Sequence, residues 1–205
     1  MITQRADFGG IWWPDYDHKP EACFAKVMRR LSDTQVSANL CAQHRVCVQA
    51  GGHAGLWAQE LSKRFDRVWT FEPEQALYAC LLRNVGKNMK IVPSGAALGS
   101  FEGTVKMTPH PSAGSWSVQA DGTVPVRQVT IDSLNLMFCD LIVLDIEGYE
   151  VEALRGGEDT ISRCRPVIHV EMGAKSRDGI ARELRRMGYE FKIRTHGDEI
   201  YVPRC

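Results

Sequence analysis

Several features of other protein classes are missing from this sequence. No run approaches the roughly 18 apolar residues of a membrane-spanning helix, and Met1–Asp7 lacks the apolar core of a signal peptide. The seven cysteines form no C-x-x-C pair of the kind that holds zinc or performs redox chemistry. Neither sign of charge is in surplus, because 25 Lys and Arg balance 25 Asp and Glu, whereas nucleic-acid-binding proteins normally carry a basic surplus. These absences predict a cytoplasmic protein with reduced thiols and without a membrane or nucleic-acid partner.

The length and composition predict one globular domain. A chain of 205 residues is too short for two full domains, and its 44% apolar and 24% charged residues are near the globular averages. We expect a helical N-terminal extension over residues 1–44, because Phe24, Val27 and Leu31 recur at helical spacing. No strand is expected there, and Trp12–Pro14 are expected to be packing residues. The α/β core is predicted over residues 45–205.

Strand and helix patterns alternate along the core. Apolar runs suited to buried strands are each followed by residues at helical spacing, with glycine or proline between them. Consecutive strand–helix units imply a doubly wound, mostly parallel sheet, since the crossovers are helical and right-handed. The predicted strands of this sheet are 46–49, 68–71, 91–92, 141–144 and 167–170.

Two segments depart from the alternation. Residues 99–131 are rich in Gly, Ser, Thr and Pro and predict an inserted β-hairpin or loop. This segment either overhangs the functional site or is an ordinary surface excursion. Residues 191–193 and 200–202 flank a polar turn and predict a terminal antiparallel hairpin.

The first candidate site is the strand–glycine–helix turn from Val46 to Gly55. Glycines let a ligand approach the backbone, and a helix N-terminus offers N–H groups to an anionic ligand. A dinucleotide fingerprint would need glycine where His53 stands, which disfavours NAD. Glu72 ends the next strand, where an acid accepts hydrogen bonds from ribose hydroxyls in such folds. The pattern therefore favours an adenosine-containing ligand over an ordinary turn with a solvated carboxylate.

The second candidate site is the strand 141–144, which delivers Asp145 and Glu147 at its carboxyl end. Ligands of open parallel sheets bind beyond those ends. If the strand continues, both acids share one face and point into one site. The alternative is that the carboxylates complement a helix dipole, which suits Glu147 and Glu150 better than Asp145.

Six motifs follow one another along the chain: 46–55, Phe71-Glu72-Pro73, 129–134, Leu144-Asp-Ile-Glu-Gly-Tyr-Glu150, Leu154-Arg-Gly-Gly157 and Arg165-Pro-Val-Ile-His-Val-Glu171. In combination and in this order, these motifs resemble the FkbM-type methyltransferases. The resemblance spans about residues 45–172 and implies an S-adenosylmethionine-dependent, Rossmann-like fold with seven strands, the last antiparallel. It also implies O-methylation of natural products, sugars or glycans.

The resemblance implies a set of site residues. The residues expected to bind the cofactor are Gln49, Ala50, Gly51, Gly52, His53, Gly55, Glu72, Pro73, Ala96, Ala97 and Asp145. Two residues depart from the family: Gln49 replaces the usual Asp, and Val143 replaces a frequent Lys. An amide at position 49 can hydrogen-bond the methionine end of the cofactor but lacks the charge attraction to its ammonium.

Asp145, Glu147, His169 and Glu171 are the candidate catalytic residues, because the strands ending at 145 and 171 are expected to be neighbours. Asp145 is expected to be the positioner or base, and His169 with a nearby carboxylate could serve as a general base. Two alternatives stay open: the same acids hold a divalent ion, or His169 is buried behind the sheet. Our leading expectation is no metal.

These observations predict an S-adenosylmethionine-dependent methyltransferase that acts on a hydroxyl of a small molecule or carbohydrate. A catalytically decayed cofactor-binding or interaction module is one alternative. An NAD-dependent oxidoreductase is the other, opposed by His53 and by the acidic strand end.

Overall fold

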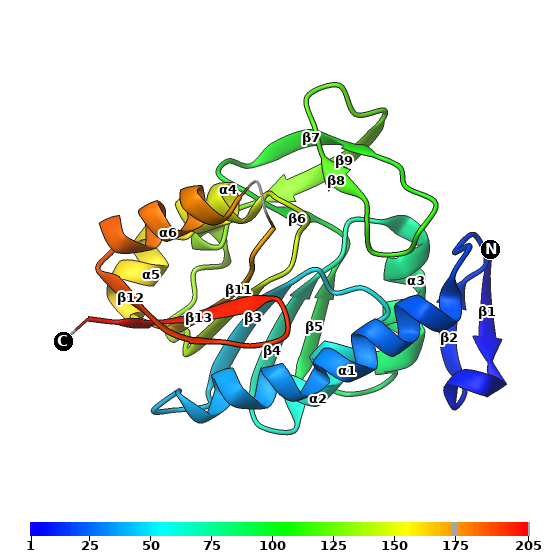
Figure 1. Cartoon of the computed structure of the whole chain (residues 1–205), viewed down its shortest axis with the longest axis horizontal. Coiled ribbons are helices and arrows are strands. Elements are labelled where there is room, and N and C mark those ends of the chain that lie inside the picture. The colour runs from blue at the N-terminus through cyan, green and yellow to red at the C-terminus, as the bar shows by residue number, and fades with distance from the viewer. Residues whose placement is uncertain (174–175, 205) are drawn as a thin grey trace.

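The computed structural model describes residues 1–173 and 176–204. Its centre is a seven-stranded sheet in the order β12-β13-β11-β10-β3-β4-β5 (Figure 1). Five neighbouring strands are parallel, and β13 runs antiparallel to both β11 and β12. The sheet therefore confirms the predicted doubly wound fold with an antiparallel last strand. Its strands are β3 (Val46–Ala50), β4 (Arg67–Phe71), β5 (Ile91–Ser94), β10 (Leu141–Leu144), β11 (Val167–Glu171), β12 (Tyr189–Arg194) and β13 (Asp198–Pro203).

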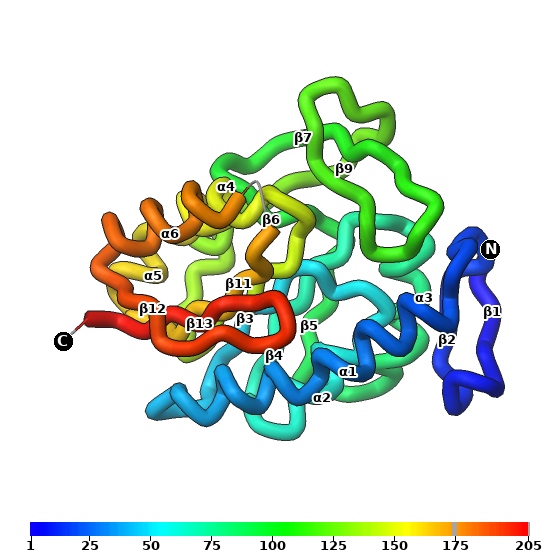
Figure 2. The backbone as a smooth tube through the Cα atoms, viewed as in Figure 1, coloured from blue at the N-terminus to red at the C-terminus, as the bar shows by residue number. Residues whose placement is uncertain are grey.

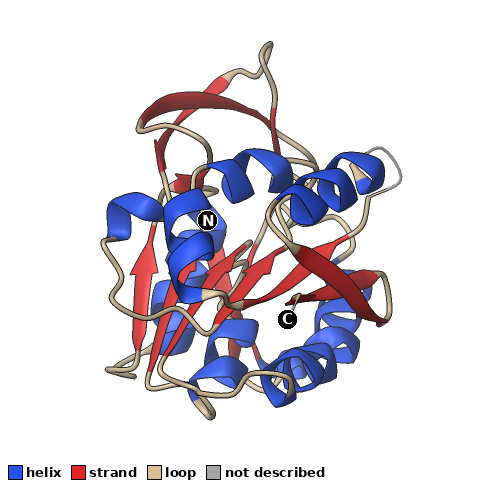
Figure 3. Cartoon of the chain, turned by 90° about the vertical axis from the view of Figure 1, so that its left-hand side faces the viewer, coloured by secondary structure: helices blue, strands red, loops and turns tan. Residues whose placement is uncertain are grey.

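Helices cover both faces of this sheet (Figure 3). One face packs against α1 (Pro20–Asn39), α2 (Leu56–Ser62) and α3 (Gln75–Val85). The other face packs against α4 (Glu150–Arg155), α5 (Glu158–Cys164) and α6 (Arg177–Arg186). All four residues of β10 are buried, as expected for a strand covered on both sides. The sequence pattern did not predict α5 as a separate helix.

The inserted segment forms a second sheet of four strands in the order β6-β9-β7-β8. It lies beyond the C-terminal ends of the parallel strands, at the top of Figure 1. Leu98 and Val129 of this sheet are buried in the same core cluster as β10 and β11. The prediction of a β-insertion is thus confirmed, with more strands than one hairpin. The strands are β6 (Ala97–Leu98), β7 (Gly103–Thr108), β8 (Ser117–Val118) and β9 (Val124–Val129), followed by the short 3₁₀ helix η2 (Asp132–Leu134).

The N-terminal segment is not purely helical, so that prediction was wrong. An antiparallel hairpin of β1 (Ile2–Arg5) and β2 (Ile11–Pro14), joined by η1 (Ala6–Phe8), precedes α1 and packs beside α3 (Figure 2). Trp13 is 1% exposed, stacks edge-on against Phe8 and Phe24, and donates its indole N–H to Asp17. Burial of these rings stabilises two strands too short to show a period-two pattern.

Two predicted absences can be compared with the described residues. Within residues 1–173 and 176–204, no helix has both the length and the apolar character needed to cross a membrane. The six cysteines of these ranges are free thiols. Cys205, for which a reduced thiol was also expected, lies outside the described residues.

Asp140 fixes the start of β10 against the start of β3. Its carboxylate accepts hydrogen bonds from the backbone N–H of Arg45 (2.8 Å) and Val46 (3.2 Å), and it also pairs with the Arg45 guanidinium. Burial opposes ionisation, but Arg45 and the backbone donors prevail and lower the pKa of Asp140 below 3.8. The ionised carboxylate is therefore stabilised more in the folded than in the unfolded chain.

We expect Asp140→Asn to lower the free energy of unfolding by about 1–2 kcal/mol at about pH 7. Because the folded-state pKa of Asp140 is depressed, its stabilisation is present above 3.8 and is lost as the pH falls through the folded-state value. Urea unfolding of wild type and variant should therefore converge in acid. The exposed Asp66→Asn is the matched control and should match wild type at every pH. A deficit for Asp140→Asn that stays constant into acid would contradict the assignment.

Candidate active site

A cavity of about 310 Å³ lies at the C-terminal ends of the parallel strands. Its floor consists of the turns that follow β3, β4, β5 and β10. Its other walls come from α1, from the first turns of α2 and α3, and from the segment between β7 and β8. The lining residues relevant to the predicted site are Ala50, Gly51, Gly52, His53, Glu72, Pro73, Ala96, Ala97, Asp145 and Glu147, together with Cys23, Lys26, Arg30, Ala113 and Trp116.

The glycine turn is required by close backbone contacts. Gly51 has φ +82°, and a Cβ at this position would lie 2.0 Å from the carbonyl oxygen of Asp145. A Cβ on Gly52 would lie 2.7 Å from Leu81 and 2.8 Å from the Thr70 hydroxyl. Only glycine fits such contacts without displacing backbone or packed side chains. The turn therefore brings the ends of β3 and β10 together at the cavity.

The N–H groups of this turn have partners within the chain. The amides of Gly51 and Gly52 both donate to the Phe71 carbonyl, Gly55 donates to Gly52, and His53 donates to Glu72. The sequence had suggested N–H groups free for an anionic ligand, and the structure does not provide them here. A phosphate of a dinucleotide would lack these donors.

Glu72 is a buried carboxylate at the cavity wall. Its two oxygens accept from the backbone N–H groups of His53 (2.7 Å) and Glu74 (2.9 Å), so the carboxylate is fixed in orientation. Burial raises the pKa of Glu72 to about 7 against the effect of those two donors, and the nearby Glu74 and Asp145 add to the rise. The remaining lone pairs can accept hydrogen bonds from ligand hydroxyl groups.

His53 connects the glycine turn to α1 and to the β7–β8 segment. Its Nδ1 accepts the backbone N–H of Ala54, and its Nε2 lies 3.7 Å from the Cys23 sulfur. Burial lowers the pKa of His53 to about 4 and raises that of Cys23 to about 11, so both groups are neutral at physiological pH. His53 therefore lines the cavity as a neutral ring, and Cys23 is not a reactive thiolate.

Three carboxylates converge at the other end of the cavity. Oxygen atoms of Asp145, Glu147 and Glu171 lie within 4.8 Å of one another. Asp145 and Glu147 line the cavity, whereas Glu171 is not a lining residue. β10 ends at Leu144, so the acids do not share a strand face as predicted. Left-handed backbone at Glu147 (φ +55°) and Gly148 (φ +99°) turns the loop back instead.

Burial is the main cause of the raised pKa values of Glu147 and Glu171, and the neighbouring Asp145 charge adds to both. Glu150, by contrast, accepts from the N–H groups of Ile146 (3.3 Å) and Gly148 (3.0 Å) and so supports the loop rather than facing a ligand. Three converging carboxylates have the oxygen donors of a hard divalent ion. A guanidinium, however, already lies against two of them.

That guanidinium belongs to Arg30 of α1, which our sequence analysis missed. Its Nη1 lies 3.4 Å from Asp145 and 3.3 Å from Glu171, and its Nη2 pairs with Asp198 of β13. One signal was available in the sequence. Arg30 follows Val27 by three residues and therefore lies on the buried face of α1.

Besides Glu171, three predicted site residues lie outside the cavity lining. His169 is 1% exposed and contacts the Ser37 hydroxyl and Asp198, so it lies between the sheet and α1, as the alternative had it. Gln49 is fully buried, donates to the Gly51 carbonyl and accepts from Thr70. Gly55 has φ +87° and packs its backbone against Leu81 and Val85. None of these three is a lining residue.

Comparison with solved structures supports the fold. A methyltransferase FkbM from Methylobacillus flagellatus KT matches with a TM-score of 0.58 and 22% identity, covering 78% of this chain and 43% of that one. A precorrin-6y C5,15-methyltransferase from Geobacter metallireducens GS-15 matches with a TM-score of 0.52 and 12% identity, covering 84% and 85%. The N-methyltransferase NodS from Bradyrhizobium japonicum WM9 matches with a TM-score of 0.51 and 10% identity, covering 86% and 96%.

Our chain thus spans less than half the length of the FkbM structure. No curated protein matches the sequence significantly. The family model "Methyltransferase FkbM domain" matches residues 49–191, which is well over half of the chain. The chain therefore belongs to the FkbM methyltransferase domain family, and its cofactor is S-adenosylmethionine.

Proposed function

We propose that this chain transfers a methyl group from S-adenosylmethionine to a hydroxyl group of a small molecule or carbohydrate in the cytoplasm. The observation that carries the proposal is that one and the same cavity is lined by the glycine turn, Glu72 and Asp145. The same cavity then holds Glu72 as the carboxylate for the ribose hydroxyls and Asp145 as the carboxylate for the reacting hydroxyl.

The residues present fit the cofactor. Glu72 is buried, is fixed by two backbone donors and has acceptor capacity left for two hydroxyls. Apolar and small residues beside it, including Pro73, Ala96 and Ala97, suit the flat face of an adenine. We assign Ala50, Gly51, Gly52 and His53 to the methionine and ribose portions, with Asp145 nearby.

When bound, S-adenosylmethionine supplies an electrophilic methyl group on a sulfonium. The protein has to align the acceptor oxygen, keep water away and take up the hydroxyl proton. Asp145 is the proposed base or positioner, because it lines the cavity and its carboxylate is 25% exposed. Glu147 and Glu171 support it as its neighbours in the carboxylate cluster. We give His169 a structural role, because Ser37 and Asp198 occupy both of its ring nitrogens.

The two alternatives predict different binding. An NAD-dependent oxidoreductase would have to hold a diphosphate at a turn whose N–H groups donate within the chain. A decayed module would bind S-adenosylhomocysteine without turning over any acceptor. Calorimetry with S-adenosylmethionine, S-adenosylhomocysteine and NAD separates the cofactors, and transfer of a radiolabelled methyl group to panels of hydroxylated small molecules and saccharides separates the enzyme from the relic.

Glu72→Ala should weaken binding of S-adenosylhomocysteine by about 2–4 kcal/mol, since it removes two charge-assisted hydrogen bonds. Affinity in wild type should also fall as the pH drops below about 7, because protonation of Glu72 removes the charge that the ligand hydroxyls contact. Isothermal titration calorimetry over a pH series measures both effects.

Glu102→Ala is the control for this experiment, since Glu102 is exposed and outside the cavity lining. It should retain wild-type affinity and wild-type pH dependence. A folded Glu72→Ala variant with unchanged affinity would refute the assignment of Glu72.

Asp145→Asn keeps the size of the side chain and removes its charge. We expect turnover to fall by roughly 10² if base catalysis operates, while cofactor affinity stays within a few-fold, because Glu72 is untouched. Radiolabelled methyl transfer to an accepted substrate measures the rate. Asp121→Asn, exposed in the insertion, is the matched control. Parental turnover in Asp145→Asn would rule out this role.

A further inference from the structure

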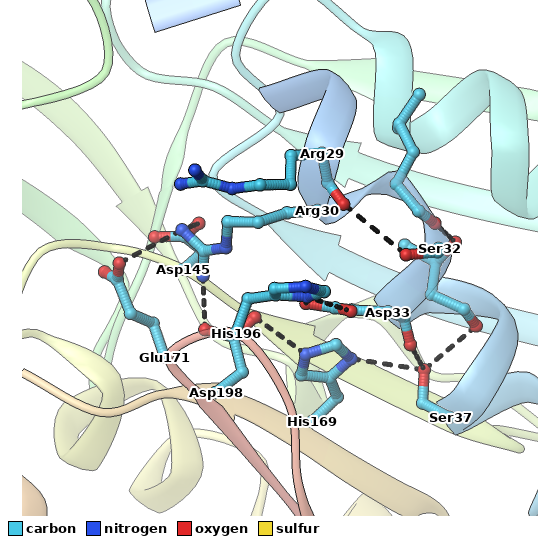
Figure 4. A network of polar contacts seen from close by, with 12 residues as sticks. Arg29, Arg30, Ser32, Asp33, Ser37, Asp145, His169, Glu171, His196 and Asp198 are labelled. Carbon is cyan, nitrogen blue, oxygen red and sulfur yellow. Dashed lines mark hydrogen bonds and ion pairs between the residues drawn. The ribbon is translucent and has the colours of Figure 1, made fainter. Parts of the chain in front are cut away.

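Arg30 is a buried cation that the methyl-transfer scheme does not use. Its side chain is 5% exposed, and its guanidinium contacts Asp145, Glu171 and Asp198 (Figure 4). These carboxylates come from three separate elements: the loop after β10, β11 and β13. Arg30 itself lies on α1, outside the matched residues 49–191. One side chain of the N-terminal extension therefore joins three parts of the core.

Carboxylates outnumber positively charged groups around Arg30. Asp145, Glu147 and Glu171 converge within 4.8 Å, and Asp198 pairs with the other side of the guanidinium. The second nearby cation, Lys26, is half exposed and reaches only Glu171, at 3.9 Å. Within the described residues, Arg30 is thus the buried positive charge of this cluster. Repulsion among the carboxylates would separate them without a cation between them.

Two further contacts fix the position of the Arg30 guanidinium. Its guanidinium lies 5.6 Å from the ring centre of Trp57 on α2. Asp198 in turn contacts His169, and His169 contacts Ser37, which lies about two turns after Arg30 on α1. Figure 4 shows this chain of contacts running from the acids back to the helix. Trp57 and Asp198 therefore restrict the Arg30 guanidinium to this position.

We propose that Arg30 is the resident cation of the Asp145–Glu147–Glu171 cluster and acts as a positioning residue that holds Asp145 at the cavity wall. The guanidinium takes the place that a hard divalent ion would take among these oxygen ligands. The meaning of this role for catalysis rests on the proposed function. The presence of the cation does not, because it follows from the contacts alone.

The proposal predicts that removing the charge creates a site for a divalent ion. The probe is Mn²⁺, and the variant is Arg30→Gln combined with Asp198→Asn, so that no buried carboxylate loses its partner on the far side. The variant should bind Mn²⁺ at least about tenfold more tightly than wild type, since a unit positive charge within about 4 Å of the ligands has been removed. Calorimetry and the electron paramagnetic resonance of Mn²⁺ measure the affinity.

Three further variants locate the effect. Adding Glu147→Gln to the double variant should abolish the gain, because it removes one of the converging ligands. Arg30→Lys keeps a positive charge and should exclude Mn²⁺ as wild type does. Arg29→Met removes an exposed cation one residue away on the same helix and should behave as wild type.

A double variant without any gain in Mn²⁺ affinity overturns the proposal, and so does a wild type that binds Mn²⁺ as tightly. If the double variant does not fold by itself, far-ultraviolet circular dichroism with and without Mn²⁺ decides. Folding restored by the ion supports a resident cation, and a chain that stays unfolded in Mn²⁺ overturns it. Mn²⁺ binding needs neither cofactor nor acceptor, so its failure is distinct from a failure of methyl transfer. Affinity for S-adenosylhomocysteine, measured on the same variants, tests the cofactor end separately.

Discussion

The contact between Gly51 and the Asp145 carbonyl is the constraint on which the rest of the site depends. The two strands that carry these residues, β3 and β10, are parallel neighbours, and the Asp145 N–H donates to the Ala50 carbonyl. Because a Cβ on Gly51 would lie 2.0 Å from the Asp145 oxygen, glycine alone permits this approach. The approach sets the acidic loop beside the glycine turn, so residues about ninety positions apart in the sequence line one cavity.

The candidate site could be predicted from the sequence where its geometry follows from strand order. Glu72 and Asp145 each end an apolar strand, and the C-terminal ends of parallel strands meet at one edge of the sheet. The positions of these two residues at strand ends therefore predicted that they lie at the same edge of the sheet. The doubly wound sheet and the terminal hairpin followed from the same local patterns, since buried strands and amphipathic helices differ in period.

Other residues could not be placed because their roles depend on the direction of a side chain or on distant partners. His169 and Gln49 lie on the face of the sheet that packs against α1 and α2, and their polar atoms are used up there. The β1–β2 hairpin owes its stability to Trp13, Phe8 and Phe24, whose contact only the tertiary structure creates. Arg30 pairs with acids that follow it by more than a hundred residues.

The two ends of the cavity are held by different means. Glu72 is oriented by backbone N–H groups of His53 and Glu74, which belong to the turns on either side of it. Asp145 is oriented by a side chain from a helix outside the matched family region. A backbone donor survives almost any substitution, whereas a guanidinium is lost with a single one. The Glu72 end of the cavity is therefore fixed by the fold itself, and the geometry of the acidic end depends on what the N-terminal extension supplies.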